Sequence, residues 1–241
     1  MKKLTFNSIT FEKLKRLILN GYFKKKTIFN FMNSNNLYYY KKDPLFRKYV
    51  TSSNNFVLID GFIISAYLNG KRLRGPEFTR KLFNDKELLK NKKHFFIGFE
   101  KKDLNLLSKK CPLLKRKNLF SYNPPYIKGT FIFPEKERKK IIKLINRQKI
   151  DYLWVGVGAP KQDLLSNQIY NKVKTKFLFN VGAAFDFITE KKKEAPSFIQ
   201  SIGLEWFFRL LTDFKHTKKK VWQSLLGSFY MLGKIKKKDF N

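Results

Sequence analysis

The sequence predicts an α/β fold: a Rossmann-like, mostly parallel sheet with helices on both faces, followed by a C-terminal helical appendage rich in basic and aromatic residues. Two observations lead to this prediction. Short apolar runs with many β-branched and aromatic residues alternate with longer segments of helical spacing, and such alternation is typical of helices packed on both faces of a parallel sheet. After about residue 195 the alternation stops, and the rest of the chain combines helical spacing with clustered aromatic and basic side chains.

The predicted elements follow one another along residues 1–194. Strands are expected at residues 27–32, 56–59, 94–99, 151–157 and 177–181, and helices at residues 37–50, 61–68, 76–90, 102–110, 134–148 and 160–173. Pro134 and Pro160 mark two helix starts, because a proline in the first helical turn loses no hydrogen bond. Residues 195–241 carry no strand signal, so we divide the chain into an α/β core, 1–194, and a helical appendage, 195–241.

The composition supports a folded core and argues against a metal site. Hydrophobic residues make up 43% and aromatic residues 17% of the 241-residue chain, which excludes disordered and collagen-like proteins. The single cysteine, Cys111, excludes an intramolecular disulfide, and one cysteine with two histidines cannot build the usual zinc site. We therefore expect neither a structural metal nor a cofactor.

The charge allows two interpretations. With 52 basic and 18 acidic residues, the formal net charge is +34, which favours polyanionic partners. Only nine of the basic residues are arginine, however, and the chain is also rich in Asn, Ile and Phe, a pattern typical of AT-rich coding. The charge is thus either compositional drift on solvated faces or a surface for a polyanion. Because no recognised nucleic-acid module is present, we expect no specific nucleic-acid partner.

The sequence predicts a cytoplasmic protein whose membrane contact is peripheral. Residues 1–10 lack the apolar centre of a signal peptide, and no window of about 18 apolar residues could span a bilayer. In the appendage, Trp206 and Trp222 lie among lysines, either on core-packing helices with basic outer faces or at an interface with anionic lipid. The same apolar surface could serve a second copy of the chain and give a homo-oligomer.

The first candidate for chemistry is Asp60, which follows a predicted strand and precedes Gly61 and a helix. A carboxylate at the carboxyl end of a parallel strand faces the ligand crevice. Asp60 is therefore a candidate general base that would take a proton from a hydroxyl group. The structural alternative is a cap on the following helix, a position that favours Asp.

Two glycine turns follow other predicted strands. Gly156 and Gly158 would let the backbone approach a ligand, and the amides of the next helix favour phosphate oxygens. Lys161 and Gln162 would project at the same mouth. The third glycine of the dinucleotide fingerprint and the P-loop pattern are both missing, so we expect a diphosphate-bearing ligand of another kind.

The last strand end and a nearby loop add further polar groups. Gly182 permits close approach at the end of the last strand, and Asp186 either faces the ligand or pairs with a lysine or a helix end. Arg72 and Arg74 lie in the loop NGKRLRGPEF. In a lysine-rich chain, a retained arginine suggests a planar, bidentate contact with phosphate or carboxylate, although a surface salt bridge is the common alternative.

Taken in order, these blocks resemble the WecG/TagA/CpsF family of bacterial glycosyltransferases. The resemblance runs from about residue 27 to residue 221 and is carried by IDG at 59–61, KRLRGPEF at 71–78, VGVGAPKQD at 155–163, NVGAAFDF at 180–187, AP at 195–196 and GLEWFFRLL at 203–211. Each block is short, but their order makes the set specific.

The resemblance implies a metal-independent, inverting transfer of a sugar from a nucleotide donor to a polyprenyl diphosphate-linked saccharide during synthesis of cell-surface polysaccharide. The donor would be a UDP-linked N-acetylmannosamine, its uronic acid or a related hexose. The enzyme would lie on the inner face of the cell membrane, at an anionic lipid surface. Without a metal, the protein itself would neutralise the charge of the departing diphosphate.

The resemblance also implies roles for particular residues. Asp60 matches the proposed base of the family, and Arg72 matches an arginine expected to neutralise the leaving group. Asn33 lies at the family's asparagine after the first strand, and Gln162 is expected near the donor. The basic C-terminal motif of the family corresponds to the following cationic residues of this chain: Arg209, Lys215, His216, Lys219 and Lys220.

Three positions depart from the family pattern. Glu194 stands where the family usually has arginine before Ala-Pro, Phe31 replaces a threonine found in several members, and DFKH at 213–216 replaces Glu-Pro-Arg-Arg. Lysine can supply a point charge but not a bidentate clamp. Besides an active glycosyltransferase, the sequence therefore leaves open a degenerate member without turnover and a basic nucleic-acid-binding protein.

Overall fold

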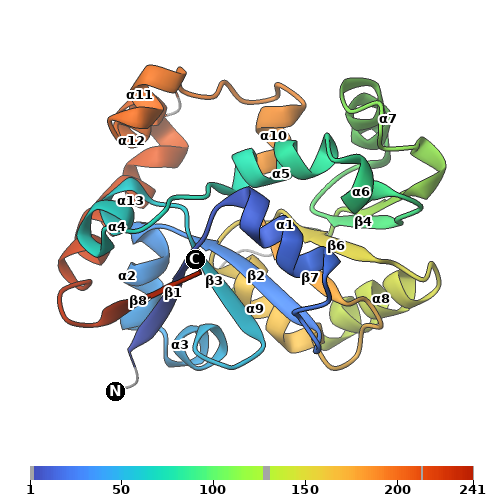
Figure 1. The fold of residues 1–241 in the computed structure, drawn as a ribbon, viewed down its shortest axis with the longest axis horizontal. Helices are drawn as coiled ribbons and strands as arrows, with labels where there is room; N and C mark the ends of the chain where they lie inside the picture. The colour runs from blue at the N-terminus through green and yellow to red at the C-terminus, as the bar shows by residue number, and fades with distance from the viewer. Residues whose placement is uncertain (1–2, 127–130, 213, 241) are drawn as a thin grey trace.

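An eight-stranded parallel sheet forms the centre of the protein (Figure 1). The structure is a computed structural model, which describes residues 3–126, 131–212 and 214–240, without the side chains of residues 209, 215 and 216. The sheet order is β5-β4-β6-β7-β2-β3-β1-β8, and every described pairing is parallel. The strands are β1 Leu4–Ser8, β2 Thr27–Met32, β3 Asn55–Ile59, β4 His94–Ile97, β5 Leu119–Tyr122, β6 Tyr152–Val155, β7 Phe177–Asn180 and β8 Ile235–Asp239.

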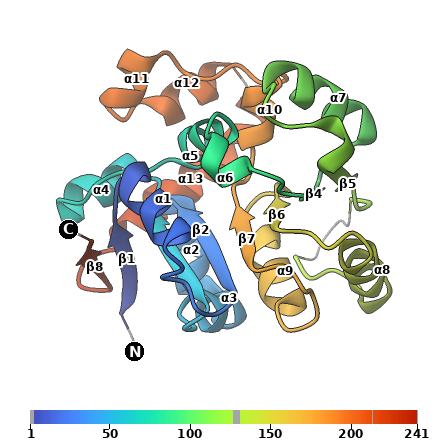
Figure 2. The same cartoon turned by 45° about the vertical axis from the view of Figure 1, so that its right-hand side comes forward.

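Thirteen α-helices are described around this sheet, and they cover both of its faces (Figures 1 and 2). They are α1 Phe11–Leu19, α2 Ser34–Lys42, α3 Pro44–Val50, α4 Phe62–Leu68, α5 Gly75–Phe83, α6 Lys86–Leu89, α7 Lys101–Lys110, α8 Glu135–Asn146, α9 Lys161–Ile169, α10 Ala184–Ile188, α11 Ser197–Ser201, α12 Glu205–Thr212 and α13 Phe214–Phe229. The predicted α/β class with helices on both faces is confirmed.

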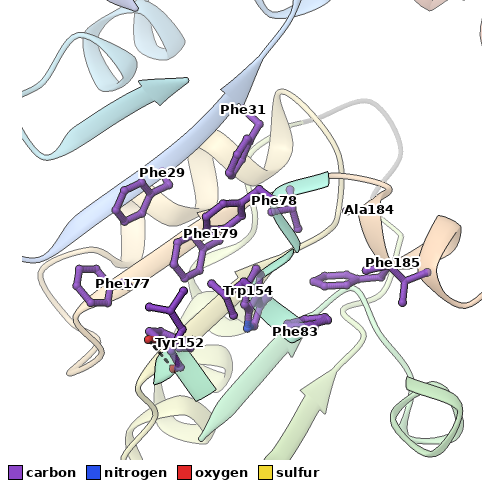
Figure 3. Packing of buried hydrophobic residues seen from close by; sticks show 14 of the residues in the cluster. Phe29, Phe31, Phe78, Phe83, Tyr152, Trp154, Phe177, Phe179, Ala184 and Phe185 are labelled. Carbon is purple, nitrogen blue, oxygen red and sulfur yellow. Dashed lines mark hydrogen bonds between the residues drawn. The ribbon is translucent and has the colours of Figure 1, made fainter. Parts of the chain in front are cut away.

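The two faces of the sheet bury different kinds of side chain, because successive residues of a strand point to opposite faces. One face is aromatic: Phe29 and Phe179 stack with their ring centroids 5.0 Å apart, and Trp154 stacks on Phe179 at 4.6 Å (Figure 3). Helices α1, α5 and α10 close this layer. The alternate strand residues are aliphatic, such as Leu153 and Leu178, and pack under α8 and α9.

Two predicted helices are each divided in the structure. The segment 37–50 forms α2 and α3, separated at Asp43 and Pro44. Pro44 cannot continue a helix at an interior position, but it suits a first turn. The Asp43 side chain accepts hydrogen bonds from the amides of Leu45 and Phe46, which starts α3 anew. The segment 76–90 is similarly divided into α5 and α6, and Asp85 caps α6.

The sequence analysis missed two helices, α1 and α10, and three strands, β1, β5 and β8. The prediction that residues after 195 contain no strand is wrong for β8, which pairs with β1 over its whole length. Lysines at 236, 237 and 238 hide this strand in the sequence, because an edge strand needs only one apolar face and Ile235 alone is buried. The separate C-terminal appendage is not confirmed, and the division at residue 195 stays a prediction.

The C-terminal helices contact two different parts of the core. Helices α11 and α12 lie on the side of the molecule where the strands end, at the top of Figures 1 and 2. Helix α13 packs closely against α2, with the Gly227 Cα facing the backbone of Ser34. None of the helices in the described part of the chain is both long enough and apolar enough to cross a membrane.

Candidate active site

The carboxyl ends of four neighbouring strands bring the predicted site residues to one edge of the sheet. The strand order places β6, β7, β2 and β3 side by side. Since all four are parallel, the residues that follow them lie along the same edge. Asn33 follows β2, Asp60 follows β3, Gly156 follows β6 and Gly182 follows β7 by two residues.

The Asp60 carboxylate joins two of these segments. Its Oδ2 accepts a hydrogen bond from Nδ2 of Asn33 at 3.4 Å, and its Oδ1 accepts one from the backbone amide of Gly75 at 3.0 Å. These contacts bear on the alternative that Asp60 caps a helix. Helix α4 begins after Gly61 with no side-chain cap, whereas Gly75 is the first residue of α5. Asp60 therefore stabilises the start of α5, across space, and is not the cap of the helix that follows it.

Asn33 is fixed by the start of α2. Its Oδ1 accepts a hydrogen bond from the amide of Asn35 at 3.0 Å, while the side chain of Asn36 bonds back to the Asn33 amide at 3.1 Å. This reciprocal cap leaves Nδ2 of Asn33 to donate to Asp60. The structure thus brings Asn33 and Asp60 together, and the reciprocal cap fixes the orientation of the Asn33 side chain.

Arg72 contacts Asp60 through the backbone and reaches the C-terminal helices with its guanidinium group. Nε donates to the Asp60 carbonyl oxygen at 2.7 Å, Nη1 donates to the Gln200 carbonyl oxygen at 3.0 Å, and Nη2 pairs with Glu205 Oε1 at 2.5 Å. Arg72 therefore lies beside Asp60, and its guanidinium group pairs with a carboxylate of this chain, as the salt-bridge alternative proposed. Its predicted role at the leaving group stays a prediction.

Gln162 and the two glycine turns form the other half of the site. The Gln162 side chain is buried, its Oε1 accepts from the Gly182 amide at 3.0 Å, and its Nε2 donates to the Asn180 carbonyl oxygen at 3.3 Å. A Cβ on Gly156 would lie 3.1 Å from the Gly182 carbonyl oxygen. Gly182 itself has φ of +58°, which favours glycine. The two turns therefore abut, and a side chain at Gly156 would push them apart.

Three predicted residues lie at the outer rim of these turns. Gly158 has φ of +80°, and its Cβ position is open. The Lys161 Nζ lies 4.5 Å from the centre of the Tyr126 ring, a cation–π distance. Asp186, in the first turn of α10, pairs with Lys192 at 3.4 Å, as the salt-bridge alternative proposed. These three residues follow β6 and β7, whereas Asp60 follows β3.

The predicted C-terminal cations are described only in part. The side chains of Arg209, Lys215 and His216 lie outside the described part of the structure. Lys219 and Lys220 lie on α13 with exposed side chains. Their predicted contact with a ligand stays a prediction.

The departures from the family pattern at Phe31 and Glu194 both have structural partners. Phe31 is buried and packs on Phe78, with ring centroids 5.0 Å apart. Glu194 pairs with Arg80 at 2.7 Å and with Arg74 at 3.2 Å. Burial alone would raise the pKa of Glu194, but the two arginines hold it below its ordinary value.

Sequence reasoning missed Glu205 and Asp163. Glu205 pairs with both Arg72 and Arg74 and so joins α12 to the loop before α5. The signal was available, because Glu205 is one of few acids in a basic segment. Asp163 is buried beside Asn180, and burial raises its pKa to about 7. Its Oδ2 has no hydrogen-bond partner among the described residues.

The site offers a carboxylate held by an amide, two glycine turns that lead into helices, and a nearby arginine. The carboxylate can accept a proton, and a backbone amide at the Gly158 turn, before α9, can bind a phosphate oxygen. No group of three His, Cys, Asp or Glu side chains in the described parts of the chain is placed to hold a metal ion. The arrangement suits group transfer between a hydroxyl and a phosphate-bearing donor.

Comparison with known proteins finds relatives of one described activity. A Bacillus subtilis (strain 168) protein is 29% identical over 175 residues, which cover 68% of this chain and 63% of the relative. A Staphylococcus aureus (strain MRSA252) protein is 30% identical over 102 residues, 42% of this chain and 39% of the relative. Both are described as N-acetylglucosaminyldiphosphoundecaprenol N-acetyl-beta-D-mannosaminyltransferase. The alignments thus span less than two thirds of either relative.

The family itself is matched over nearly the whole chain. The model of the Glycosyl transferase WecG/TagA/CpsF family matches residues 1–239. This range contains all four strand ends of the site and the β8 strand that the sequence analysis missed. With Asn33, Asp60, Gln162 and Gly182 gathered at one edge of a parallel sheet and the family model matched over residues 1–239, the chain belongs to the Glycosyl transferase WecG/TagA/CpsF family.

Proposed function

We propose that this protein is a glycosyltransferase that moves an N-acetylmannosaminyl or related hexosyl group from a UDP-sugar to a polyprenyl diphosphate-linked saccharide. The observation that carries the proposal is the Asn33–Asp60 pair, at the edge where the glycine turns of β6 and β7 also end. The names of the Bacillus and Staphylococcus relatives support the class of acceptor. The product would serve the synthesis of a bacterial cell-surface polysaccharide, such as teichoic acid or capsule.

In the proposed reaction, Asp60 is the general base. The acceptor hydroxyl oxygen attacks the anomeric carbon of the donor sugar, and its proton passes to an Asp60 carboxylate oxygen. The bond between the anomeric carbon and the donor phosphate oxygen breaks, and its electron pair leaves with UDP. Attack from the face opposite UDP inverts the anomeric configuration. Asn33 would orient the carboxylate through its 3.4 Å hydrogen bond.

The departing diphosphate needs positive charge or hydrogen-bond donors. We propose that the backbone amide of Gly158 faces the phosphate oxygens, with Lys161 at the rim, and that no metal or other cofactor takes part. Gly156 and Gly182 would shape this turn, because their own amides donate to the Ile97 carbonyl oxygen at 2.9 Å and to Gln162 Oε1 at 3.0 Å. Arg72 would reach the diphosphate by exchanging Glu205 for a phosphate, since both are bidentate anions. The cations proposed to approach from the C-terminal helices are Arg209, Lys215, His216, Lys219 and Lys220.

The acceptor would be presented from the inner face of the cell membrane. The net charge of +34 favours an anionic surface, and α12 and α13 expose large apolar side chains such as Phe207, Leu211 and Trp222. We propose a peripheral association in which these helices meet the lipid.

A transfer assay tests this function. Purified protein is mixed with a short-chain polyprenyl diphosphate-linked N-acetylglucosamine and a panel of UDP-sugars, with EDTA or with magnesium. We expect turnover of one donor in both conditions. Asp60→Asn should lower the rate by about 10²- to 10⁴-fold, the usual contribution of a general base, while donor binding measured by calorimetry stays close to wild type.

The matched control is Asp239→Asn, which removes an acid from the sheet edge at β8. It should leave turnover unchanged. Wild-type turnover in Asp60→Asn would remove Asp60 from the mechanism. Donor binding without transfer in the wild-type protein would favour the degenerate-member alternative.

A further inference from the structure

Helix α4 exposes an apolar face directly beside the candidate base. It begins two residues after Asp60, and its sequence is FIISAYL. Ile64 is buried in the core, whereas Phe62, Ile63 and Tyr67 are 39%, 40% and 43% exposed. Ala66 is also exposed, four positions after Phe62 and three after Ile63, and Tyr67 lies four positions after Ile63. Residues spaced by three and four positions share one side of a helix, so these exposed side chains form one apolar face.

The contacts of α4 join this face to the C-terminal helices. The space where a Cβ of Gly203 would lie, between α11 and α12, is filled by the Phe62 ring. The Tyr67 hydroxyl accepts a hydrogen bond from the Gly233 amide at 3.1 Å, between α13 and β8. Both views show α4 between α11 and β8 (Figures 1 and 2). The exposed neighbours on either side are also apolar: Ile202, Leu204 and Leu232.

The charge around α4 decides which partner fits this face. Lys71 follows α4 in the chain and Lys234 precedes β8, and both are exposed. Lys237 of β8 donates from Nζ to the carbonyl oxygen of Asn69, at the end of α4, at 3.0 Å. A second copy of the chain would bring another net charge of +34 against the same cations, and like charges repel. An anionic lipid surface offers an apolar interior for Ile63 and negative head groups for the lysine rim.

We propose that the exposed face of α4, formed by Phe62, Ile63 and Tyr67, is a membrane-contact element of the α/β core. The contact with lipid is then shared between the core and the C-terminal helices, and it does not belong to the appendage alone. Because interfacial apolar faces sink about 5–10 Å below the head groups, a seated α4 would place Asp60 at the height of a lipid-linked diphosphate. That last consequence rests on the proposed function, whereas the membrane contact itself does not.

Vesicle binding tests the proposal with Ile63→Glu against a matched control, Leu19→Glu. Leu19 is 45% exposed at the end of α1, outside the α4 face. Binding to vesicles of phosphatidylglycerol and phosphatidylcholine is measured by sedimentation. Ile63→Glu should weaken partitioning by about tenfold or more, as expected for the loss of one inserted apolar side chain. Leu19→Glu should bind like the wild type. Equal binding by the two variants would overturn the proposal.

A second measurement does not depend on the folding of a charged variant. Ile63→Cys and Leu19→Cys are labelled with a polarity-sensitive fluorophore, the native Cys111 being buried. Vesicles should shift the emission of the label at 63 to that of an apolar medium and leave the label at 19 unchanged. If the label at 63 keeps its aqueous emission while vesicles are bound, α4 does not contact lipid and the proposal fails. If the emission shifts without lipid, and more strongly at higher protein concentration, a second copy of the chain covers this face and the proposal also fails.

The same proteins separate this proposal from the proposed function. If wild-type protein transfers no sugar but the label at 63 still enters the bilayer, the function fails and the membrane contact of α4 stands. If transfer occurs but the label at 63 stays in water, the function stands and the α4 proposal fails.

Discussion

At the scale of single residues, a row of buried and half-buried polar side chains runs from α9 across β7 and β2 to the start of β3. Asn180 Oδ1 accepts from Ser166 Oγ at 2.5 Å, and Asn180 Nδ2 donates to Asn30 Oδ1 at 2.7 Å. Asn30 Nδ2 in turn donates to Asn55 Oδ1 at 2.7 Å. Such a row costs little when each donor meets an acceptor. Asp163 is the exception, since its Oδ2 lacks a partner among the described residues.

Asp163→Asn should therefore change how stability depends on pH. Burial raises the pKa of Asp163 from 3.8 to about 7, so between these values the folded protein holds a proton that the unfolded chain releases. The free energy of unfolding then falls as the pH rises through this window. Each pKa unit corresponds to about 1.4 kcal/mol, so the rise in the pKa of Asp163 corresponds to about 4 kcal/mol of unfolding free energy between low and high pH. Asn carries no such proton, so the variant should gain stability over the wild type as the pH rises from 4 to 8.

Denaturant unfolding of both proteins across this pH range measures the difference. The comparison with wild type is needed because His94 acts in the opposite direction. Burial lowers the pKa of His94 to about 3, so its contribution to stability is lost as the pH falls below about 6.5. This term is common to both proteins and cancels. A difference between the proteins that stays constant with pH would show that Asp163 is not buried as an isolated acid.

Some of the site could be read from residue types and some could not. Asp60 and the glycine turns were predictable, because the carboxyl ends of parallel strands are where ligands bind. The pairing of Arg72 with Glu205 was not, since 133 positions separate them and only the tertiary structure brings them within 2.5 Å. The buried hydrogen bond between Asn30 and Asn180 was also not predictable. In the sequence, each of these residues is a single polar residue in an apolar strand, and nothing local shows that the two are partners.

At the scale of secondary-structure elements, the packing of α13 on α2 depends on one glycine. A Cβ on Gly227 would lie 1.9 Å from the carbonyl oxygen of Ser34, which is backbone and cannot turn aside. Next to this contact, Ser228 Oγ donates to Ser34 Oγ at 3.0 Å. The two helices therefore approach as closely as their backbones permit.

Gly227→Ala should destabilise the protein although alanine is the better helix former. Alanine would normally stabilise a helix by about 1 kcal/mol relative to glycine. Here the overlap with Ser34 must be relieved by moving α13, at a typical cost of about 1–3 kcal/mol. The melting temperature should fall by roughly 2–4 °C for each kcal/mol, and limited proteolysis should cleave near α13 more rapidly.

Leu225→Ala provides the control on the same helix. Leu225 is 44% exposed, so its truncation removes little buried surface. A melting temperature for Gly227→Ala equal to or above that of Leu225→Ala would mean that α13 is not held against α2 in solution.

Ion pairs join helices α11 and α12 to the loop before α5, near the carboxyl edge of the sheet. Arg72 and Arg74 meet Glu205 of α12, and Arg74 and Arg80 meet Glu194 just before α11. Several of these charges are largely buried, so removing one partner would leave the other unpaired in a poorly solvated place. Arg72 links these helices to the site, because its Nε also donates to the Asp60 carbonyl oxygen.

The elements themselves were predictable where the core needs them to be apolar. Strands β2, β3, β4, β6 and β7 are buried on both faces and appear in the sequence as apolar runs. Edge strands have no such requirement. In β8 the exposed positions hold lysine, and the strand is defined by its pairing with β1, a contact more than 200 residues away in sequence that local patterns do not report.

At the scale of the whole molecule, the first and last strands of the chain pair with each other at one edge of the sheet. Strand β1 begins the sheet near the N-terminus, and β8 pairs with it at the C-terminus, so that Leu4 lies opposite Ile235 (Figure 1). Met231 and Ile235 join the same core as Leu4 and Phe6. The last residues therefore contribute to the core, and the segment 195–241 is bound at both of its ends.

The net charge of +34 sets the behaviour of the whole molecule in salt. A chain of this length has a radius of gyration of about 18 Å, while the screening length is about 30 Å at 10 mM salt and about 10 Å at 100 mM. At low salt every lysine therefore repels most of the others. We expect the melting temperature to rise by several degrees, roughly, when the salt is raised over this range, because the folded state holds the charges closest together.

Binding to anionic vesicles should change in the opposite direction, since the same salt screens the attraction between the lysine rim and the lipid head groups. Thermal scans and vesicle sedimentation in one salt series measure both effects, with phosphatidylcholine vesicles as the uncharged control. A melting temperature that falls with salt would mean that the attractive pairs, such as Arg80 with Glu194, outweigh the repulsion.

Vesicle binding that survives high salt would mean that apolar insertion outweighs charge. If DNA binds more tightly than anionic vesicles at every salt concentration, the basic surface serves a nucleic acid and the membrane assignment is wrong.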